Sequence, residues 1–413
     1  MFGRKISSLR NKVKRNKTKK SAKTISTGYV VSVILFVTLM ATFALVSPIV
    51  KAMISFEPST KFDKTEVEKW DYSKKFKVLL VGMDKKTEEY MFVDAIALLV
   101  VDPKHDQVGI INISPDVLID GSQVTLRRGL IDSDKADIVY LTEELLATEI
   151  DRYVIVDRVY LDKMAKFTKT IRVENMQDVG DLDVLSKNNS SRWAKGTHSV
   201  QGGEIDDYVR SDNNGEDEQL QRQLEIYKRY VQNIDVVKLI LGTEELLEIL
   251  EDTLSTNLSR NEIYYLYYYL RSVPPASYSY AITKSDILSE VGHAGVYDVY
   301  KVNDAQLDYN TNAILEDKDS VFEQTTVEIL NASGQSGKAK RFSRWVGNVG
   351  LEVIHVGNAP FASNNTEIYA PKMNEYPRSI EHLRLIFGEN AKIIDNEYDY
   401  RHIGKVVVVI GEN

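Results

Sequence analysis

The longest apolar run of the chain covers residues 28–50, and the rest of the sequence is organised around it. From Tyr29 to Val50 the run has no ionisable side chain other than Tyr29, and its polar groups are short hydroxyls. About 22 residues at about 1.5 Å each form roughly 33 Å of helix, enough to cross a hydrocarbon core. The pattern therefore predicts a transmembrane helix. The alternative, a cleaved signal peptide, is less consistent with so long a run and with the lack of a small-x-small site before Lys51.

Beyond this run, polar stretches separate two regions that have the patterns of sheet proteins. Residues 51–74 are polar without apolar periodicity and predict a stalk. Residues 75–302 contain short apolar runs between turns and helical patterns, which predicts a mixed-sheet α/β domain. Its expected strands are 76–84, 95–101, 107–113 and 152–156. Its expected helices are 141–147, capped by Thr142, one that begins near residue 217, 243–250 and 261–270.

The C-terminal part repeats the α/β pattern on a smaller scale. Residues 303–324 are polar and acidic and predict a linker, and residues 325–413 predict a separate small α/β domain. The expected strands of this domain are 327–330, 351–356, 366–369 and 405–410, and its expected helices are 337–349 and 379–387. The fold class is thus α/β, with a transmembrane helix followed by two α/β domains.

Charge is distributed very unevenly along the chain. Residues 1–28 hold ten of the 52 Lys and Arg residues and no acid, so the remainder has 42 basic against 60 acidic residues, a net charge of −18. Basic residues stay on the cytoplasmic side during insertion. We therefore expect residues 1–27 to be a cytoplasmic tail, residues 28–50 to cross the membrane once, and the bulk of the chain to lie outside. The basic tail fits anionic lipid head groups better than nucleic acid.

Composition excludes several kinds of chemistry. The chain has no cysteine, which excludes thiol catalysis and Cys-ligated metal. Its six histidines are scattered, with no pair at the spacing of metal ligands. The strongly acidic exterior argues against nucleic acid as a partner.

Several short motifs occur together in one order. In the first domain they are Leu-Leu-Val-Gly-Met-Asp at 79–84, Asp94 before a strand, Asp102-Pro103, Asp116 at a strand end, Gly-Gly-Glu-Ile-Asp-Asp-Tyr-Val-Arg at 202–210, and Arg222-Gln223. In the last domain they are Val-Glu-Ile-Leu-Asn-Ala-Ser-Gly at 327–334, Gly337, Ala339, Gly350, Thr-Glu-Ile at 366–368 and the ending Val-Val-Val-Val-Ile-Gly at 406–411. In this order the chain resembles the LytR-CpsA-Psr family of bacterial cell-envelope proteins, with that family's C-terminal accessory domain.

The resemblance implies a function at the bacterial cytoplasmic membrane. Members of the family are understood as phosphotransferases that move an anionic glycopolymer from polyprenyl pyrophosphate to peptidoglycan, with Mg²⁺ held by aspartates. Carried over residue by residue, Asp94 and Asp116 would be the catalytic, metal-holding acids, with Asp84 as a further metal candidate. Arg210 and Arg222 would bind the pyrophosphate, since guanidinium forks bind phosphate bidentately.

The sequence departs from the family pattern at four arginine positions, which here hold Phe92, Pro115, Asp212 and Gln219. Arg127 and Arg128, in the loop after Asp116, are candidates to replace the lost charges. Two hypotheses follow. One is an active Mg²⁺-dependent transferase, and the other is a catalytically degenerate relative that serves as an envelope binding or scaffold protein.

Overall fold

The computed structural model describes residues 69–87, 90–119, 124–130, 136–157, 159–179, 193–211, 253–283, 287–294, 297–388 and 390–412, with a few single positions between 222 and 249. The expected tail (1–27), the expected transmembrane helix (28–50) and most of the expected stalk (51–74) lie outside these residues. Among the helices that the structure describes, none has both the length and the apolar character that a membrane crossing requires.

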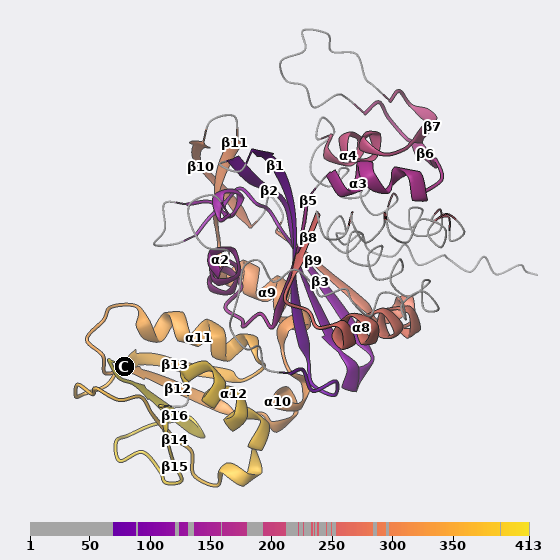
Figure 1. Ribbon diagram of the computed structural model, residues 1–413. Coiled ribbons are helices and arrows are strands. Elements are labelled where there is room, and N and C mark those ends of the chain that lie inside the picture. Colours follow the sequence, from indigo (N-terminus) through magenta and orange to yellow (C-terminus); the bar gives the residue numbers. More distant parts are fainter. Residues whose placement is uncertain are drawn as a thin grey trace, which may run out of the picture.

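The first module, defined here as residues 69–315, is built on a mixed six-stranded sheet in the order β8-β5-β1-β2-β3-β9 (Figure 1). The central strands pair antiparallel as β1 with β2 and β2 with β3, whereas β1 with β5 and β3 with β9 are parallel. The strands are β1 (Phe76–Thr87), β2 (Tyr90–Asp102), β3 (Gln107–Ile113), β5 (Arg152–Asp157), β8 (Leu254–Thr256) and β9 (Tyr278–Ile282). The four strands expected from the apolar runs are confirmed as β1, β2, β3 and β5.

Both faces of this sheet are covered, which explains why its strands are apolar at nearly every position. Alternate residues of β1 enter two separate cores: Val78 and Leu80 on one face, Leu79 and Val81 on the other. The first core includes residues of α3 (Val159–Met164), α4 (Gly203–Arg210) and α8 (Arg260–Ser272). The second includes residues of α2 (Ala136–Leu146) and α9 (Asp304–Leu315).

Smaller elements surround the sheet. A three-stranded sheet has the order β10-β11-β4, and β6 pairs with β7. The bounds are β4 (Val117–Leu118), β6 (Ile171–Asn175), β7 (Gly196–Val200), β10 (Leu288–Ala294), β11 (Tyr297–Val302), and the 3-10 helices η2 (Pro103–His105), η3 (Leu126–Arg128), η4 (Ala165–Phe167) and η5 (Pro275–Ser277). None of these smaller elements was predicted from the sequence.

The expected helices of the first module have mixed outcomes. The segment 261–270 is confirmed as α8, which begins with a capping box between Ser259 and Glu262. The segment 141–147 lies in α2, but the expected cap at Thr142 is wrong. Thr142 is buried inside the helix, and its hydroxyl donates to the carbonyl of Ile138 one turn earlier. The helices expected near 217 and at 243–250 lie outside the described residues, apart from single positions.

The segment expected as a polar linker, residues 303–324, is helical and packed. It forms α9 and α10 (Lys318–Glu323), with Asn303 and Asp317 as side-chain N-caps. Leu307, Ile314 and Leu315 of α9 are buried in the second core of the first module. These helices could not be recognised in the acidic sequence, because only one narrow side of α9 is apolar.

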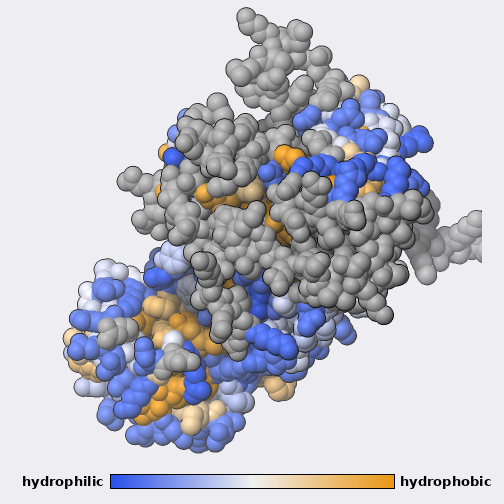
Figure 2. Space-filling view, in the orientation of Figure 1, coloured by the Kyte–Doolittle hydropathy of each residue, from blue (hydrophilic) through white to orange (hydrophobic). Residues whose placement is uncertain are grey.

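The C-terminal module, defined here as residues 326–410, is a five-stranded mixed sheet in the order β13-β12-β16-β14-β15. Its elements are β12 (Thr326–Asn331), α11 (Lys338–Asn348), β13 (Glu352–Asn358), β14 (Glu367–Tyr369), η6 (Met373–Glu375), α12 (Pro377–Phe387), β15 (Lys392–Ile394) and β16 (Val406–Ile410). The expected strands and helices of this module are all confirmed. Figure 2 shows an apolar area on its surface that hydrophilic residues surround.

Candidate functional site

Two of the aspartates singled out in the sequence converge on one arginine. Arg127 binds Asp116 through two parallel contacts, Nε to Oδ1 at 2.5 Å and Nη2 to Oδ2 at 2.8 Å. Its Nη1 also donates to Oδ1 of Asp94 at 3.1 Å and to the carbonyl of Val93 at 3.2 Å. The three side chains are 11–19% exposed, so this cluster of one cation and two anions is mostly shielded from solvent. We call it the Asp94–Asp116–Arg127 cluster.

A β-bulge between β1 and β2 sets the direction of the Asp94 side chain. In the ladder between β1 and β2, Gly82 pairs with Ala95 but Met83 pairs with Val93, so Asp94 is the extra residue of a β-bulge. Bulges redirect side chains and are common beside functional sites. Val93 is therefore buried in the second core while Asp94, its neighbour, reaches Arg127.

Asp116 is fixed by the turn that follows β3. The backbone amide of Ser114 donates to the hydroxyl of Thr283 at 2.8 Å, and the carbonyl of Asp116 accepts from the amide of Tyr300 at 3.1 Å. The next residue, Val117, begins β4, which pairs with β11. The carboxylate of Asp116 is thus presented from a turn that is bonded on both sides.

Arg127 is presented by the short helix η3. Its amide donates to the carbonyl of Pro115 at 2.6 Å, which ties η3 to the turn before Asp116. Leu126 is buried in the second core and anchors the helix. Arg128, the other candidate for a replacement charge, is exposed. The sequence placed both arginines after Asp116, but only the fold shows which of them spans the two acids.

The other candidate residues are placed elsewhere or are incompletely described. The guanidinium of Arg222 is buried, donates to the carbonyls of Tyr208 and Ser211, and lies 6.0 Å from the Tyr208 ring centroid. Tyr208 belongs to the first core, on the other face of the sheet from Val93. The contacts described for Arg222 are thus with the end of α4 rather than with the Asp94–Asp116–Arg127 cluster. Arg210 ends α4 and Asp84 lies in β1, but their side chains are outside the described set.

The cluster has the donor set of a small magnesium site. Mg²⁺ prefers one or two carboxylates and completes its shell with water and phosphate oxygens. Asp94 and Asp116 supply those two carboxylates, and their formal charge exceeds that of Arg127 by one. Within the described ranges, no group of three or more His, Cys, Asp or Glu side chains is arranged to hold a metal. Two carboxylates alone would leave most of the ligands of a cation to water or to a bound phosphate.

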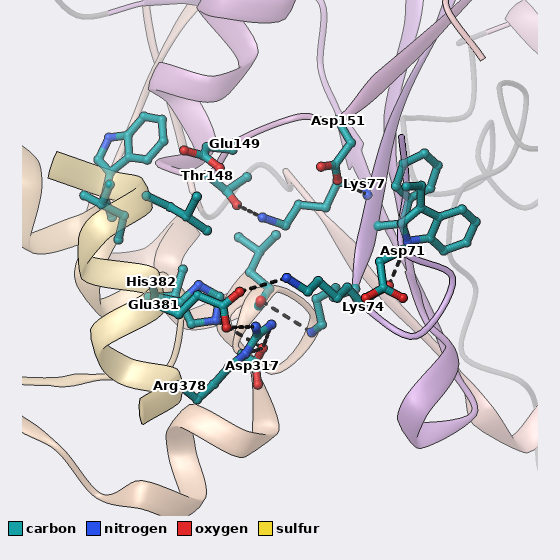
Figure 3. A pocket seen from close by; sticks show the side chains of 18 of the residues that line it. Asp71, Lys74, Lys77, Thr148, Glu149, Asp151, Asp317, Arg378, Glu381 and His382 are labelled. Atoms are coloured by element: carbon teal, nitrogen blue, oxygen red, sulfur yellow. Dashed lines mark hydrogen bonds and ion pairs between the residues drawn. The ribbon is translucent and has the colours of Figure 1, made fainter. Parts of the chain in front are cut away.

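A second feature, which the sequence did not reveal, lies toward the opposite end of β1. A cavity of about 400 Å³ separates the two modules, between the segment around Lys74 and Lys77 and helix α12 (Figure 3). Lys74 reaches across to Glu381 at 2.9 Å. Trp70, Trp345, Leu385 and Ile386 add apolar lining.

Asp317 is the centre of a group of ion pairs in the lining of this cavity. Its Oδ2 accepts from Arg378 Nη2 at 2.6 Å and lies 3.1 Å from Nε2 of His382. Burial acts to raise the pKa of Asp317, but the hydrogen bonds from His382 and Arg378 outweigh it and hold the pKa below its ordinary value. Nearby, burial lowers the pKa of Lys75 to about 8, although Asp102 opposes the shift. Because Asp317 and Arg378 are 61 residues apart, no local pattern indicates that they meet.

Fold and site together define a class: a two-module α/β protein in which two acids and one arginine form a shielded cluster. The family model of the LytR-CpsA-Psr family matches residues 42–315, and the model described as LytR cell envelope-related transcriptional attenuator matches residues 324–413. The chain belongs to the LytR-CpsA-Psr family, which confirms the resemblance seen in the sequence.

Several solved structures are similar to this chain at low identity. Protein gbs0355 from Streptococcus agalactiae is 19% identical, with a TM-score of 0.46 over 59% of this chain and 87% of that one. TagT bound to LI-WTA is 20% identical, with a TM-score of 0.45 over 61% and 96%. TagV from B. subtilis is 17% identical, with a TM-score of 0.44 over 59% and 96%. A search of curated proteins finds no match to this chain.

Proposed function

We propose that this chain is an envelope glycopolymer phosphotransferase. It takes an anionic glycopolymer from polyprenyl pyrophosphate and attaches it to peptidoglycan, outside the bacterial cytoplasmic membrane to which a single N-terminal helix anchors it. The observation that supports this proposal is the convergence of Asp94, Asp116 and Arg127 from three separate elements. Membership of the family supports the substrate class.

In the proposed reaction an acceptor hydroxyl oxygen attacks the phosphorus next to the glycan. A new oxygen–phosphorus bond forms, the bridging bond of the pyrophosphate breaks, polyprenyl phosphate leaves with the electron pair, and the hydroxyl proton passes to solvent. Asp94 and Asp116 hold the guanidinium of Arg127 in place, where its positive charge would stabilise the pyrophosphate oxygens, and the same two acids could contribute ligands to Mg²⁺. These acids would hold Mg²⁺, which would supply charge neutralisation at the leaving phosphate.

A second function, a non-catalytic envelope binding protein, has one specific observation in its favour. Arg127 is already engaged by both acids, and residues 92, 115, 212 and 219 lack the arginines of the family pattern. Such a protein would bind the pyrophosphate donor without turnover. The two functions therefore differ in product release and not in ligand binding.

The test measures release of polyprenyl phosphate by the full chain in detergent micelles, with a polyprenyl-pyrophosphate-linked oligosaccharide, peptidoglycan and Mg²⁺. We expect Asp94→Asn and Arg127→Lys each to lower turnover by about 100-fold, because each removes a group that stabilises charge in the transition state. The control is Glu290→Gln, which makes the same carboxyl-to-amide change at an exposed position of β10. Release that is absent from the unaltered protein, with donor binding intact, would establish the second function instead.

A further inference from the structure

The C-terminal end of α2 is completed by the other module. The last carbonyls of an α-helix have no partner within the helix and need donors from elsewhere. The amide of Thr148 donates to the carbonyl of Glu143 at 3.3 Å, as in a Schellman ending, and Ala147 takes up the left-handed conformation at φ 44°. This local ending leaves the carbonyls of Leu145, Leu146 and Ala147 for other donors.

Those donors come from α11, about 200 residues later in the chain. Arg344 Nη2 donates to the carbonyl of Leu145 at 2.8 Å. Asn348 Nδ2 donates to the carbonyls of Leu146 at 2.8 Å and Ala147 at 3.4 Å. The two donors are four residues apart in α11 and therefore share one helix face. Asn348 is 2% exposed, so its contacts are shielded from water.

Two acids of α9 hold Arg344 in this position. Its Nε and Nη2 bind the two oxygens of Asp308 at 2.8 Å each, and its Nη1 lies 3.4 Å from Asp304. On the same face of α11, Arg341 pairs with Glu144 of α2. The end of α2 is thus fixed by side chains of the C-terminal module, and α9 orients one of them.

The N-terminal half of α2 supports the helix that presents Arg127. Leu126, Leu130 and Ile138 lie in one buried cluster. The packing is close at Gly129, where a Cβ atom would lie 3.0 Å from Cδ1 of Ile138 and 3.4 Å from Cδ1 of Leu141. A shift of α2 therefore moves the support of η3, and with it the guanidinium that spans Asp94 and Asp116.

We propose that Arg344 and Asn348 are positioning residues for the phosphate site: they cap α2 from the C-terminal module, and α2 holds η3 and Arg127 in register with the two aspartates. The module then has a role within the catalytic unit in addition to any contact with the cell wall. The kinetic part of this inference rests on the proposed function, whereas the structural coupling does not.

Hydrogen exchange on the full chain tests the coupling without any substrate. The reporters are the amides of residues 127–129, each of which donates to a backbone carbonyl. We expect Asn348→Asp, which replaces the donating amide group by a second acceptor, to speed exchange at these amides and in the last turn of α2 at least 10-fold. Arg344→Ala should have the same effect, and Arg344→Lys, which keeps one donor, should restore part of the protection. Lys340→Ala, at an exposed position of α11, is the control.

Kinetics provide the second measurement. If the chain is a transferase, Asn348→Asp should lower kcat about 10-fold with little change in the KM for the acceptor, and Arg344→Lys should recover part of the loss. Faster exchange confined to α11, or a uniform increase over both modules, would overturn the coupling. A protein without turnover in which the 127–129 amides still respond would refute the transferase and leave the coupling intact.

Discussion

At the scale of single residues, the fold shifts the pKa of side chains whose sequence neighbours give no sign of a shift. Burial raises the pKa of Glu143, in α2, to about 7, although the carboxylate accepts a hydrogen bond from the amide of Ile150 at 2.8 Å. Nearby Glu149 raises it further and Lys77 lowers it. Glutamate is usually ionised on a helix surface, but the surroundings of Glu143 favour its neutral form.

Glu143 should make stability depend on pH. Between pH 4.5 and 7 the folded state binds more protons at this site than the unfolded state, so its contribution is complete below about pH 4.5 and is lost as the pH rises through 7. With allowance for solvent screening we expect a loss of about 1–2 kcal/mol. Glu143→Gln keeps the acceptor and should remove this part of the slope in urea unfolding at pH 4.5 and 7.5. An unchanged slope, equal to that of Glu290→Gln, would contradict the assignment.

At the scale of elements, close contacts decide which segments belong to the core. Helix α9 packs on β3 at Gly109, where a Cβ atom would lie 2.2 Å from Cγ2 of Ile314. The missing side chain allows the helix to approach the sheet, and Leu307 and Leu315 are buried beside it. A segment of acidic composition therefore becomes part of the first module.

Gly109→Ala should destabilise the protein by about 1–3 kcal/mol, because the added methyl group overpacks the contact between β3 and α9. The cost should shrink when Ile314 is also replaced by alanine, which a double-mutant cycle in chemical unfolding measures. Gly292→Ala is the matched control, since a Cβ atom there meets no atom within 4 Å. Equal costs for Gly109→Ala with and without Ile314 would show that the close contact is not the cause.

At the scale of the whole molecule, ion pairs that differ in burial hold the C-terminal module to the first module and to the segment that connects the two. The pair of Lys74 and Glu381 is 52% and 40% exposed, whereas Arg378 and Asp317 are 20% and 8% exposed. Exposed pairs contribute little because water and salt screen them, but removing one partner of a shielded pair leaves the other charge uncompensated. Arg378, which ties α12 to the segment that connects the modules, should therefore contribute more to stability than Lys74, which bridges the cavity.

We expect Lys74→Met to change the free energy of unfolding by less than about 0.5 kcal/mol and Arg378→Met to lower it by about 1–3 kcal/mol. Because the pKa of Asp317 is held below its ordinary value, this stabilisation is present above about pH 4 and is lost as the pH falls further. Arg378→Met should thus reduce the sensitivity to acid, which thermal unfolding from pH 7 to pH 3 will show. Similar losses for both variants would refute the role of burial.

The sequence alone determined features that depend on neighbouring residues. Apolar runs placed β1, β2, β3, β5 and the elements of the C-terminal module. The apolar residues of a buried strand or of one helix face recur within a few consecutive positions, so a local pattern is enough to find them. Asp94 and Asp116 were assigned from the family resemblance, and the structure places Asp94 inside β2 rather than before it. The expected transmembrane helix rests on the same kind of local pattern.

Only the tertiary structure decided which of these residues meet. The bulge that turns Asp94, the span of Arg127 across 11 and 33 residues, and the capping of α2 by Asn348 over 202 residues all join distant parts of the chain. Such contacts depend on packing and on the need of buried polar groups for partners, which no local pattern records. The acids and the candidate arginines were named from the sequence, but which arginine spans the acids, and which helix supports it, could not be.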